Sequence, residues 1–173
     1  MVNCCPHCNT SLSGAEVEYG EKESNFWHLL YTVKETGVKL ELATTRPETM
    51  LGDTAVAINA DDPRYKHLPG CHVILPLLNK EIPIVCDEHA DMTKGTGVVK
   101  ITPAHEPNDF EVGLRHNLPI VRTFTYDGHM TGKADKEFAD ELRRSGKASK
   151  DEPEVLDCGK YAGMTTLEAR KAI

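Results

Sequence analysis

The sequence lacks any apolar run that approaches the roughly 20 residues of a membrane-spanning helix. Its first residues also lack the basic and apolar regions of a secretory signal peptide. Internal repeats and low-complexity tracts are absent, and a hydrophobic fraction of 39% with a charged fraction of 27% argues against disorder. We therefore expect a cytoplasmic globular domain with its own core and no contact with a membrane.

Positive charge is also scarce. The chain has 20 Lys and Arg residues against 27 Asp and Glu residues, which gives a formal net charge of -7. A domain that binds duplex nucleic acid through many phosphates should instead be basic. Any contact with nucleic acid must therefore be local, such as holding one nucleotide end, or must depend on a larger assembly.

The six cysteines are too few and too scattered for a secreted disulfide scaffold. Three of them form a cluster near the N-terminus, in which residues 5–8 read Cys-Pro-His-Cys. This C-x-x-C is half of a zinc site, and the sequence contains no second one. Two interpretations stay open: a reduced cysteine turn, or half of a zinc knuckle to which Cys4 or His7 adds a ligand. We favour the turn and predict no bound metal.

The pattern of apolar residues and turn signals predicts a chain rich in strands. Strands are expected at 27–33, 38–44, 54–58, 72–75, 82–85, 97–101 and 120–125. Helices are expected from Asn108, as N-cap with Glu111 reaching back, to His116; over 136–145; and after Thr165, which opens a capping box. Many strands and few helices indicate a closed barrel or a folded-over sheet. Because the sequence stops soon after the last helix begins, we expect a domain excised from a longer polypeptide.

A threonine-rich segment, Thr44-Thr45-Arg46-Pro47-Glu48-Thr49, directly follows a predicted strand. Its clustered hydroxyls and the guanidinium of Arg46 can bind a carbonyl, a ribose or a phosphate and can position a water molecule. The alternative is a turn in which the hydroxyls satisfy their own backbone.

A second polar segment runs from Gly95 to Asp109 and joins a strand to a helix through a loop bounded by prolines. The carboxylate of Asp109 suits a helix start electrostatically, which is its structural explanation. It also suits a substrate amino group, with Lys100 and Glu106 beside it. His105 is either a packed histidine bonded to backbone or a group of the site.

Together these segments resemble the editing domains of valyl-tRNA synthetases. The string of residues 43–57 resembles the threonine-rich peptide of that family, and Gly95–Gly113 resembles its second editing peptide. Residues 5–18 and 159–164 resemble the two ends of the same insertion, so the likeness covers nearly the whole chain. Glu106 departs from the family, which usually has Asp there, and Cys4 stands where Trp is more common.

The resemblance implies a mainly β fold, a closed β-barrel core with a few peripheral α-helices. It implies an N-terminal segment with the cysteine turn at residues 1–20 and the editing domain at 21–173. It also implies a set of site residues, in which Asp109, Thr45 and Lys100 are assigned to catalysis and the others to substrate binding: Thr44, Arg46, Thr49 and Glu106. To the substrate-binding residues we add His105, from its place in the polar segment and not from the resemblance.

The function that follows is hydrolysis of threonine wrongly esterified to valine tRNA, within a valine–tRNA ligase. The partners are the aminoacylated 3′ end of that tRNA and the rest of the synthetase chain, and a monomer is expected. Editing should need no cofactor, because ATP serves a separate catalytic domain. The alternatives are a non-catalytic RNA-binding zinc knuckle, the editing domain of the isoleucyl branch, and a free-standing editing protein.

Overall fold

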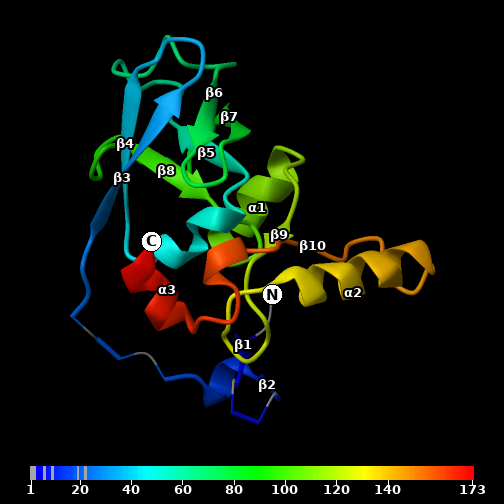
Figure 1. Cartoon of the computed structure of the whole chain (residues 1–173). Coiled ribbons are helices and arrows are strands. Elements are labelled where there is room, and N and C mark those ends of the chain that lie inside the picture. The colour runs from blue at the N-terminus through cyan, green and yellow to red at the C-terminus, as the bar shows by residue number, and fades with distance from the viewer. Residues whose placement is uncertain (1–2, 6, 9, 19, 22) are drawn as a thin grey trace.

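The structure is a computed structural model that describes residues 3–5, 7–8, 10–18, 20–21 and 23–173. A six-stranded sheet, in the upper part of Figure 1, curls into a nearly closed barrel. The strand order is β4-β3-β6-β7-β5-β8, and the edge strands β4 and β8 lie against each other. The predicted mainly β barrel is therefore confirmed. The six strands are β3 (Trp27–Val33), β4 (Lys39–Thr44), β5 (Ala55–Ile58), β6 (His72–Leu75), β7 (Lys80–Cys86) and β8 (Val98–Ile101).

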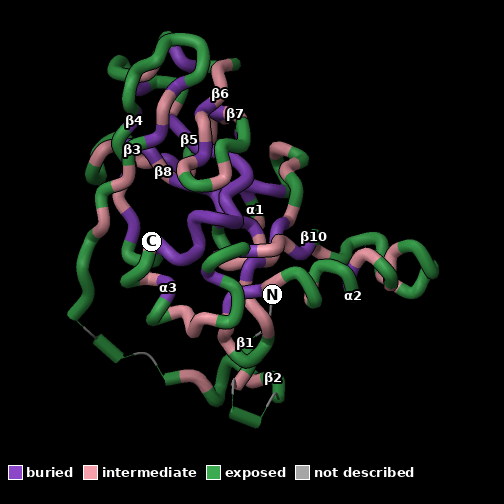
Figure 2. The backbone as a smooth tube through the Cα atoms, in the orientation of Figure 1, coloured by how far each residue is buried: buried purple, intermediate pink, exposed green. Residues whose placement is uncertain are grey.

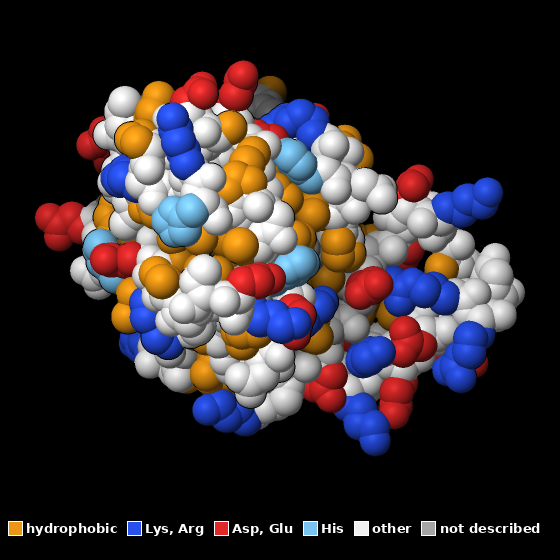
Figure 3. Space-filling model, turned by 90° about the horizontal axis from the view of Figure 1, so that it is seen from above, with side chains coloured by type: hydrophobic (Ala, Val, Ile, Leu, Met, Phe, Trp, Pro, Cys, Tyr) orange, Lys and Arg blue, Asp and Glu red, His pale blue; other side chains and the backbone are white. Residues whose placement is uncertain are grey.

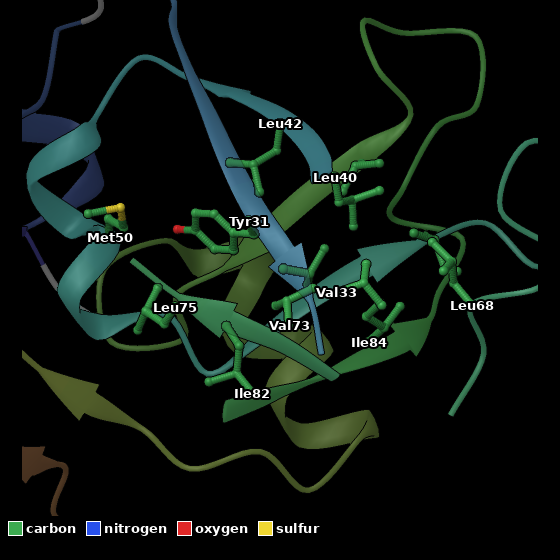
Figure 4. Packing of buried hydrophobic residues seen from close by; sticks show 13 residues of the cluster. Tyr31, Val33, Leu40, Leu42, Met50, Leu68, Val73, Leu75, Ile82 and Ile84 are labelled. Atoms are coloured by element: carbon green, nitrogen blue, oxygen red, sulfur yellow. The ribbon is translucent and has the colours of Figure 1, made fainter. Parts of the chain in front are cut away.

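Alternation along the strands determines which side chains enter the barrel. In β4, Leu40 and Leu42 are buried whereas Lys39 and Glu41 are exposed, as expected for a half-buried strand (Figure 2). Antiparallel pairing sets Tyr31 of β3 opposite Leu40. Figure 4 shows Tyr31 within the apolar cluster inside the barrel, with its hydroxyl directed toward the segment that carries Met50.

Strand β5 is buried on both faces because it lies between the barrel interior and a helix. Val56 and Ile58 belong to the barrel core, whereas Ala55 and Ala57 pack with Val112 of α1 (Pro107–Arg115). The parallel pairing of β5 with β7 and its antiparallel pairing with β8 hold it at the centre of this layer. The small alanine side chains let α1 approach the sheet closely.

Two helix starts differ from the sequence prediction. Helix α1 is capped by Glu106, two residues before the predicted Asn108, because Pro107 can occupy the first helical position at no cost in hydrogen bonds. Helix α2 (Lys133–Arg144) begins three residues before the predicted Lys136, where the Asp135 carboxylate accepts from the Gly132 amide at 2.8 Å. The predicted capping box of Thr165 and Glu168 is confirmed at the start of α3 (Thr166–Ala172).

The remaining strands are short. The predicted strand at 120–125 is reduced to β9 (Val121–Arg122), which pairs in parallel with β10 (Glu154–Val155). Near the N-terminus, β1 (Asn3–Cys4) pairs with β2 (Ser11–Leu12) outside the main sheet. The boundary between 20 and 21 stays a prediction. None of the helices in the described residues has the length and hydropathy that a bilayer crossing requires.

The cysteine turn is only partly described, because Pro6 lies outside the described residues. Cys4 and Cys8 are exposed, and the Cys8 sulfur lies 3.0 Å from the Thr10 hydroxyl. Within the described ranges, no three His, Cys, Asp or Glu side chains gather in a way that could hold a metal ion. The absence of metal stays a prediction.

Candidate functional site

A cavity of about 410 Å³ opens where the ends of β4 and β8 meet the start of α1. The threonine-rich segment supplies one side of it, and the Gly95–Asp109 segment supplies the other. These segments lie about 50 residues apart in sequence, and the nearly closed barrel brings them together. All eight predicted site residues line this cavity: Thr44, Thr45, Arg46, Thr49, Lys100, His105, Glu106 and Asp109.

The threonine-rich segment turns sharply because β4 ends at Thr44 and Pro47 begins a 3₁₀ helix, Pro47–Gly52. The Thr44 hydroxyl accepts from the Arg46 amide at 3.1 Å, and the Thr49 hydroxyl donates to the Arg46 carbonyl at 2.9 Å. Both hydroxyls thus support the local backbone, as the structural alternative proposed. Thr45 is exposed at the cavity and is the hydroxyl best placed to meet a ligand.

Lys100 lies on β8 with only 8% of its surface exposed. Its ammonium group donates to Thr49 Oγ1 at 2.7 Å, to Asp53 Oδ1 at 3.0 Å and to Thr102 Oγ1 at 2.5 Å. Since an ammonium group has three protons, these contacts use its whole donor capacity. Lys100 therefore orients two hydroxyls at the cavity wall.

Asp53 is the buried counter-ion of Lys100, and sequence reasoning missed it. Its second oxygen accepts from the Tyr31 hydroxyl at 2.6 Å, so both carboxylate oxygens are bonded. Burial raises the pKa of Asp53 to about 6, and the nearby positive charge of Lys100 opposes this shift. The signal in the sequence was an acidic residue just before a wholly apolar strand.

Asp109 is nearly buried, with 5% of its surface exposed, at the third position of α1. Its Oδ2 accepts from the Thr102 amide at 2.9 Å and from the Thr102 hydroxyl at 3.3 Å. Burial raises the pKa of this carboxyl, and the Thr102 amide and Lys100 partly offset the rise. Gly113 allows the helix to sit this close to the loop, because a Cβ there would lie 3.0 Å from Pro103.

His105 is packed into the wall. Its Nε2 lies 3.1 Å from the donating amide of Thr123 and 2.9 Å from the Thr123 hydroxyl. Its ring centroid lies 4.4 Å from that of Phe124. Burial, followed by the positive charges of Arg46 and Lys100, lowers the pKa of His105 to about 3. A neutral histidine whose Nε2 accepts from backbone matches the packed alternative.

The two remaining predicted residues lie at the rim. Arg46 is exposed, and its guanidinium donates to the His105 carbonyl at 3.0 Å, which joins the two peptides across the cavity. Glu106 caps α1 by accepting from the Asn108 amide at 3.4 Å. Its carboxylate is therefore engaged in structure, whereas the guanidinium of Arg46 is left partly open to solvent.

Two further residues, His89 and Glu48, make contacts that the sequence analysis did not predict. His89 lines the cavity, and its Nε2 lies 3.3 Å from Asp109 Oδ1. Glu48, inside the threonine-rich segment, is buried and forms a two-point ion pair with Arg170 of α3, at 2.9 and 2.5 Å. Glu48 thus ties the C-terminal helix to the barrel and is not part of the cavity.

Charge on the outer surface is mixed. On the face seen in Figure 3, acidic and basic side chains are interspersed. This fits the net charge of -7 and the expectation of a local contact with nucleic acid.

A family model described as leucyl-tRNA synthetase, editing domain, matches residues 67–173. Over its whole length the chain is 50% identical to the valine–tRNA ligase of Clostridium tetani, of which it covers 17%. It is also 49% identical, over 96% of its length, to the valine–tRNA ligase of Clostridium perfringens, of which it covers 20%. The chain thus spans a fifth or less of the length of these curated relatives.

Among solved structures, similarity extends to a chain in the ternary complex of LeuRS, tRNA and LeuAMS from Agrobacterium radiobacter K84. The TM-score is 0.52 and the identity is 18%, over 71% of this chain and 19% of that chain. At this identity the likeness supports the fold alone, a barrel of the same architecture.

Proposed function

The chain belongs to the family of the leucyl-tRNA synthetase editing domain, and from this premise we propose that it hydrolyses threonine wrongly esterified to valine tRNA. The choice of tRNA is supported by relatives near 50% identity that are named valine–tRNA ligase. The reaction is supported by the cavity, whose wall joins a cluster of threonines to a nearly buried carboxylate.

The observation that carries this proposal is the environment of Asp109. One of its oxygens is held by Thr102, and the other lies 3.3 Å from Nε2 of His89, which lines the cavity with Asp109. An aminoacyl ester carries an ammonium group beside the scissile carbonyl, and a desolvated carboxylate is a strong partner for it. Asp109 therefore anchors the amino acid and places its ester near Thr45.

Selection of threonine over valine requires a hydrogen bond. The two side chains have nearly the same shape, and an apolar pocket cannot strongly reject an isostere that adds a hydroxyl. A second site with the opposite preference must therefore reward the hydroxyl. Asp109 can accept from it as well as from the ammonium group, because a carboxylate has several lone-pair sites.

The other residues take supporting roles in this mechanism. The Thr45 hydroxyl orients the ester or the attacking water, while Thr44 and Thr49 hold the turn that presents it. Lys100 acts as a positioning residue, since its protons are shared among Thr49, Asp53 and Thr102. Arg46 faces the phosphate of the terminal nucleotide at the rim. His105 serves as packing for this wall, and Glu106 caps the helix that carries Asp109.

We further propose that editing uses no metal or cofactor and that ATP serves a separate catalytic domain of the synthetase. An aminoacyl ester is already activated, so positioning and electrostatic stabilisation of the reacting carbonyl suffice. The partners are the aminoacylated 3′ end of valine tRNA and the rest of the synthetase chain. Only the terminal nucleotide need enter the cavity, which agrees with the net charge of -7.

The direct test is deacylation by the complete synthetase that carries this domain. Threonyl and valyl esters of valine tRNA are supplied, with the Asp109→Asn variant beside the wild type. Asn keeps the size and an oxygen for the Thr102 amide but removes the charge. We expect threonyl ester to be hydrolysed and valyl ester to be spared, and Asp109→Asn to lose hydrolysis.

A matched control is Glu111→Gln, which removes an exposed carboxylate two residues further along α1. It should leave hydrolysis unchanged. Unaltered hydrolysis in a folded Asp109→Asn variant would contradict the role of Asp109. Preferential hydrolysis of a valyl ester on isoleucine tRNA would assign the chain to the isoleucyl branch instead.

Calorimetry on the 173-residue chain tests hydroxyl recognition without turnover. A non-hydrolysable threonyl-adenosine analogue should bind more tightly than the valyl analogue by about 1.5–3 kcal/mol, the range for a hydrogen bond to a charged group. Equal affinities would restrict discrimination to the transition state.

A further inference from the structure

His89 lies on the wall that separates the cavity from a second hollow of about 730 Å³. Its side chain is 28% exposed, and its Nε2 lies 3.3 Å from Asp109 Oδ1. A contact of this length is an ion pair only when the imidazole carries a proton. The proposed mechanism assigns no task to this histidine.

The backbone holds His89 in this position through Asp87. The Asp87 carboxylate accepts from the His89 amide at 2.9 Å and from Arg115 at 3.0 and 2.8 Å. It also lies 2.8 Å from Nε2 of His116. The Arg115 guanidinium beside it holds the pKa of Asp87 well below its usual range, so the carboxylate is charged at any working pH.

These bonds fix the distance between His89 and Asp109. Arg115 and His116 stand at the C-terminal end of α1, whereas Asp109 stands in its first turn. The turn that carries His89 is thereby fastened to the same helix that carries Asp109. The Ala90 carbonyl also accepts from the Asn59 side chain at 3.2 Å, which ties this turn to the end of β5.

We propose that His89 is a positioning residue of the site, which sets the charge that Asp109 presents to the substrate ammonium group. The proposal rests on the proposed function. When His89 is neutral, Asp109 Oδ1 presents a full negative charge to the cavity. When His89 is protonated, it occupies that oxygen as a counter-ion, and the substrate ammonium must compete with a second cation.

Several other charged or titratable groups line the two hollows that His89 borders. On the cavity side these are Asp109, Lys100, Glu106, Arg46 and His105. In the second hollow they are Asp87, Glu88, Glu111 and Arg115. Asp87 and Arg115 neutralise each other, and Lys100 is paired with Asp53. His105 is neutral because burial lowers its pKa to about 3. Arg46, Glu106, Glu88 and Glu111 remain, so their contribution must be separated from that of Asp109 by experiment.

The first experiment measures the pH profile of kcat/KM for threonyl-ester hydrolysis by the complete synthetase. In the wild type, a protonated imidazole pairs with Asp109 Oδ1 and competes with the substrate ammonium group for that oxygen. Hydrolysis should therefore fall on the acid side as His89 charges. In His89→Gln this competing cation is gone, so the acid limb should move to lower pH, while the plateau changes by less than about tenfold.

The control is His72→Gln, which removes another histidine that pairs with a carboxylate, Glu35 at 3.0 Å, outside the cavity. Its profile should match that of the wild type. An unmoved acid limb in His89→Gln would overturn the proposal. So would a loss above about 100-fold at every pH, because His89 would then act in the chemistry itself.

A second measurement does not depend on hydrolysis. The ring signals of His89 in the 173-residue chain are followed by NMR during a pH titration, in the wild type and in Asp109→Asn. We expect the midpoint to fall in Asp109→Asn, because the carboxylate no longer stabilises the imidazolium. Equal midpoints would overturn the pairing. A coupled titration in a protein that hydrolyses no ester would instead show that the proposed function fails while the pair stands.

Discussion

Two groups of side chains at the cavity each include an aspartate and a histidine, and we call them the closed wall and the open wall. They differ in how many hydrogen-bond donors and acceptors remain free to bind a ligand. The closed wall, formed by Lys100 and His105 with Asp53 buried behind them, has nearly every donor and acceptor satisfied within the protein. The open wall, formed by Thr45, His89 and Asp109, presents an exposed hydroxyl and a carboxylate oxygen toward the cavity.

The two buried aspartates show the difference most clearly. Asp53 is 2% exposed and Asp109 is 5% exposed, so burial does not distinguish them. Both carboxyls have a raised pKa for the same first cause, desolvation. Asp53 has a tyrosine hydroxyl and a lysine ammonium as partners, whereas among the described residues Oδ1 of Asp109 has His89 as its single partner. Spare bonding capacity, and not a shifted pKa alone, therefore identifies the functional carboxylate.

The largest expected effect is the loss of stability in Asp53→Asn, which we compare with Asp109→Asn. Asp53→Asn leaves the Lys100 charge buried without its counter-ion, and we expect it to lower the free energy of unfolding by about 3–5 kcal/mol. Asp109→Asn should cost about 1 kcal/mol or less in stability but about 10²–10³-fold in hydrolysis. Urea unfolding of the 173-residue chain and deacylation by the synthetase measure the two effects. Equal losses of stability in the two variants would contradict the distinction between a structural Asp53 and a functional Asp109.

A double-mutant cycle sharpens the same comparison. Lys100→Met alone strands the Asp53 charge, so it should also be strongly destabilising. The double variant Asp53→Asn, Lys100→Met removes both charges. It should be more stable than the sum of the single losses predicts, by about 1–3 kcal/mol. Additive losses would mean that the two groups do not act as a pair.

The third effect concerns His105 and pH. Its folded-state pKa, about 3, lies below the ordinary value of 6.5 for an unfolded chain. Between these values the unfolded state binds more protons, so the stability contributed by neutral His105 is lost as pH falls. The loss should approach about 1 kcal/mol per pH unit below 6.5.

This slope must be isolated by a variant, because Asp53, with a pKa raised to about 6, acts in the opposite direction between pH 6 and 4. His105→Gln keeps an acceptor for the Thr123 amide and removes the titration. Urea unfolding at pH 6.5, 5.5 and 4.5 should therefore give a flatter dependence for His105→Gln than for the wild type. If the free energy of unfolding depended on pH equally in His105→Gln and the wild type, His105 would be protonated in the folded chain and not packed as a neutral ring.

The barrel and the cavity could be predicted from sequence for different reasons. Period-two alternation in 39–44 and the β-branched runs directly reflect which face of a strand is buried, so the main strands were found within a few residues. The meeting of the two peptides came from the family resemblance. No local pattern shows that residues about 50 positions apart will line one cavity.

The missed features depend on tertiary partners. The Asn108 cap was an equally good local pattern, but Pro107 lets the helix begin two residues earlier, with Glu106 as its cap. Lys100 was expected to meet the substrate, and only the fold reveals that Asp53 and two threonines use its protons. His89 lies in a turn with no motif, and its position follows from the bonds of Asp87 to α1.

The smallest expected effect lies at the rim, where Arg46 belongs to neither wall. Its guanidinium donates to the His105 carbonyl, and it is otherwise exposed, so Arg46→Gln should change stability by less than about 0.5 kcal/mol. If Arg46 contacts one phosphate of the tRNA end, Arg46→Gln should weaken binding of that end several-fold. The slope of log K against log salt should then become shallower by about 0.7, as for one phosphate contact of a single strand. Lys133→Gln, which removes one exposed charge on α2, should leave both binding and slope unchanged. A slope unaltered in Arg46→Gln would confine this arginine to joining the two peptides, whereas a steep slope in the wild type would reveal a wider RNA surface than the cavity rim.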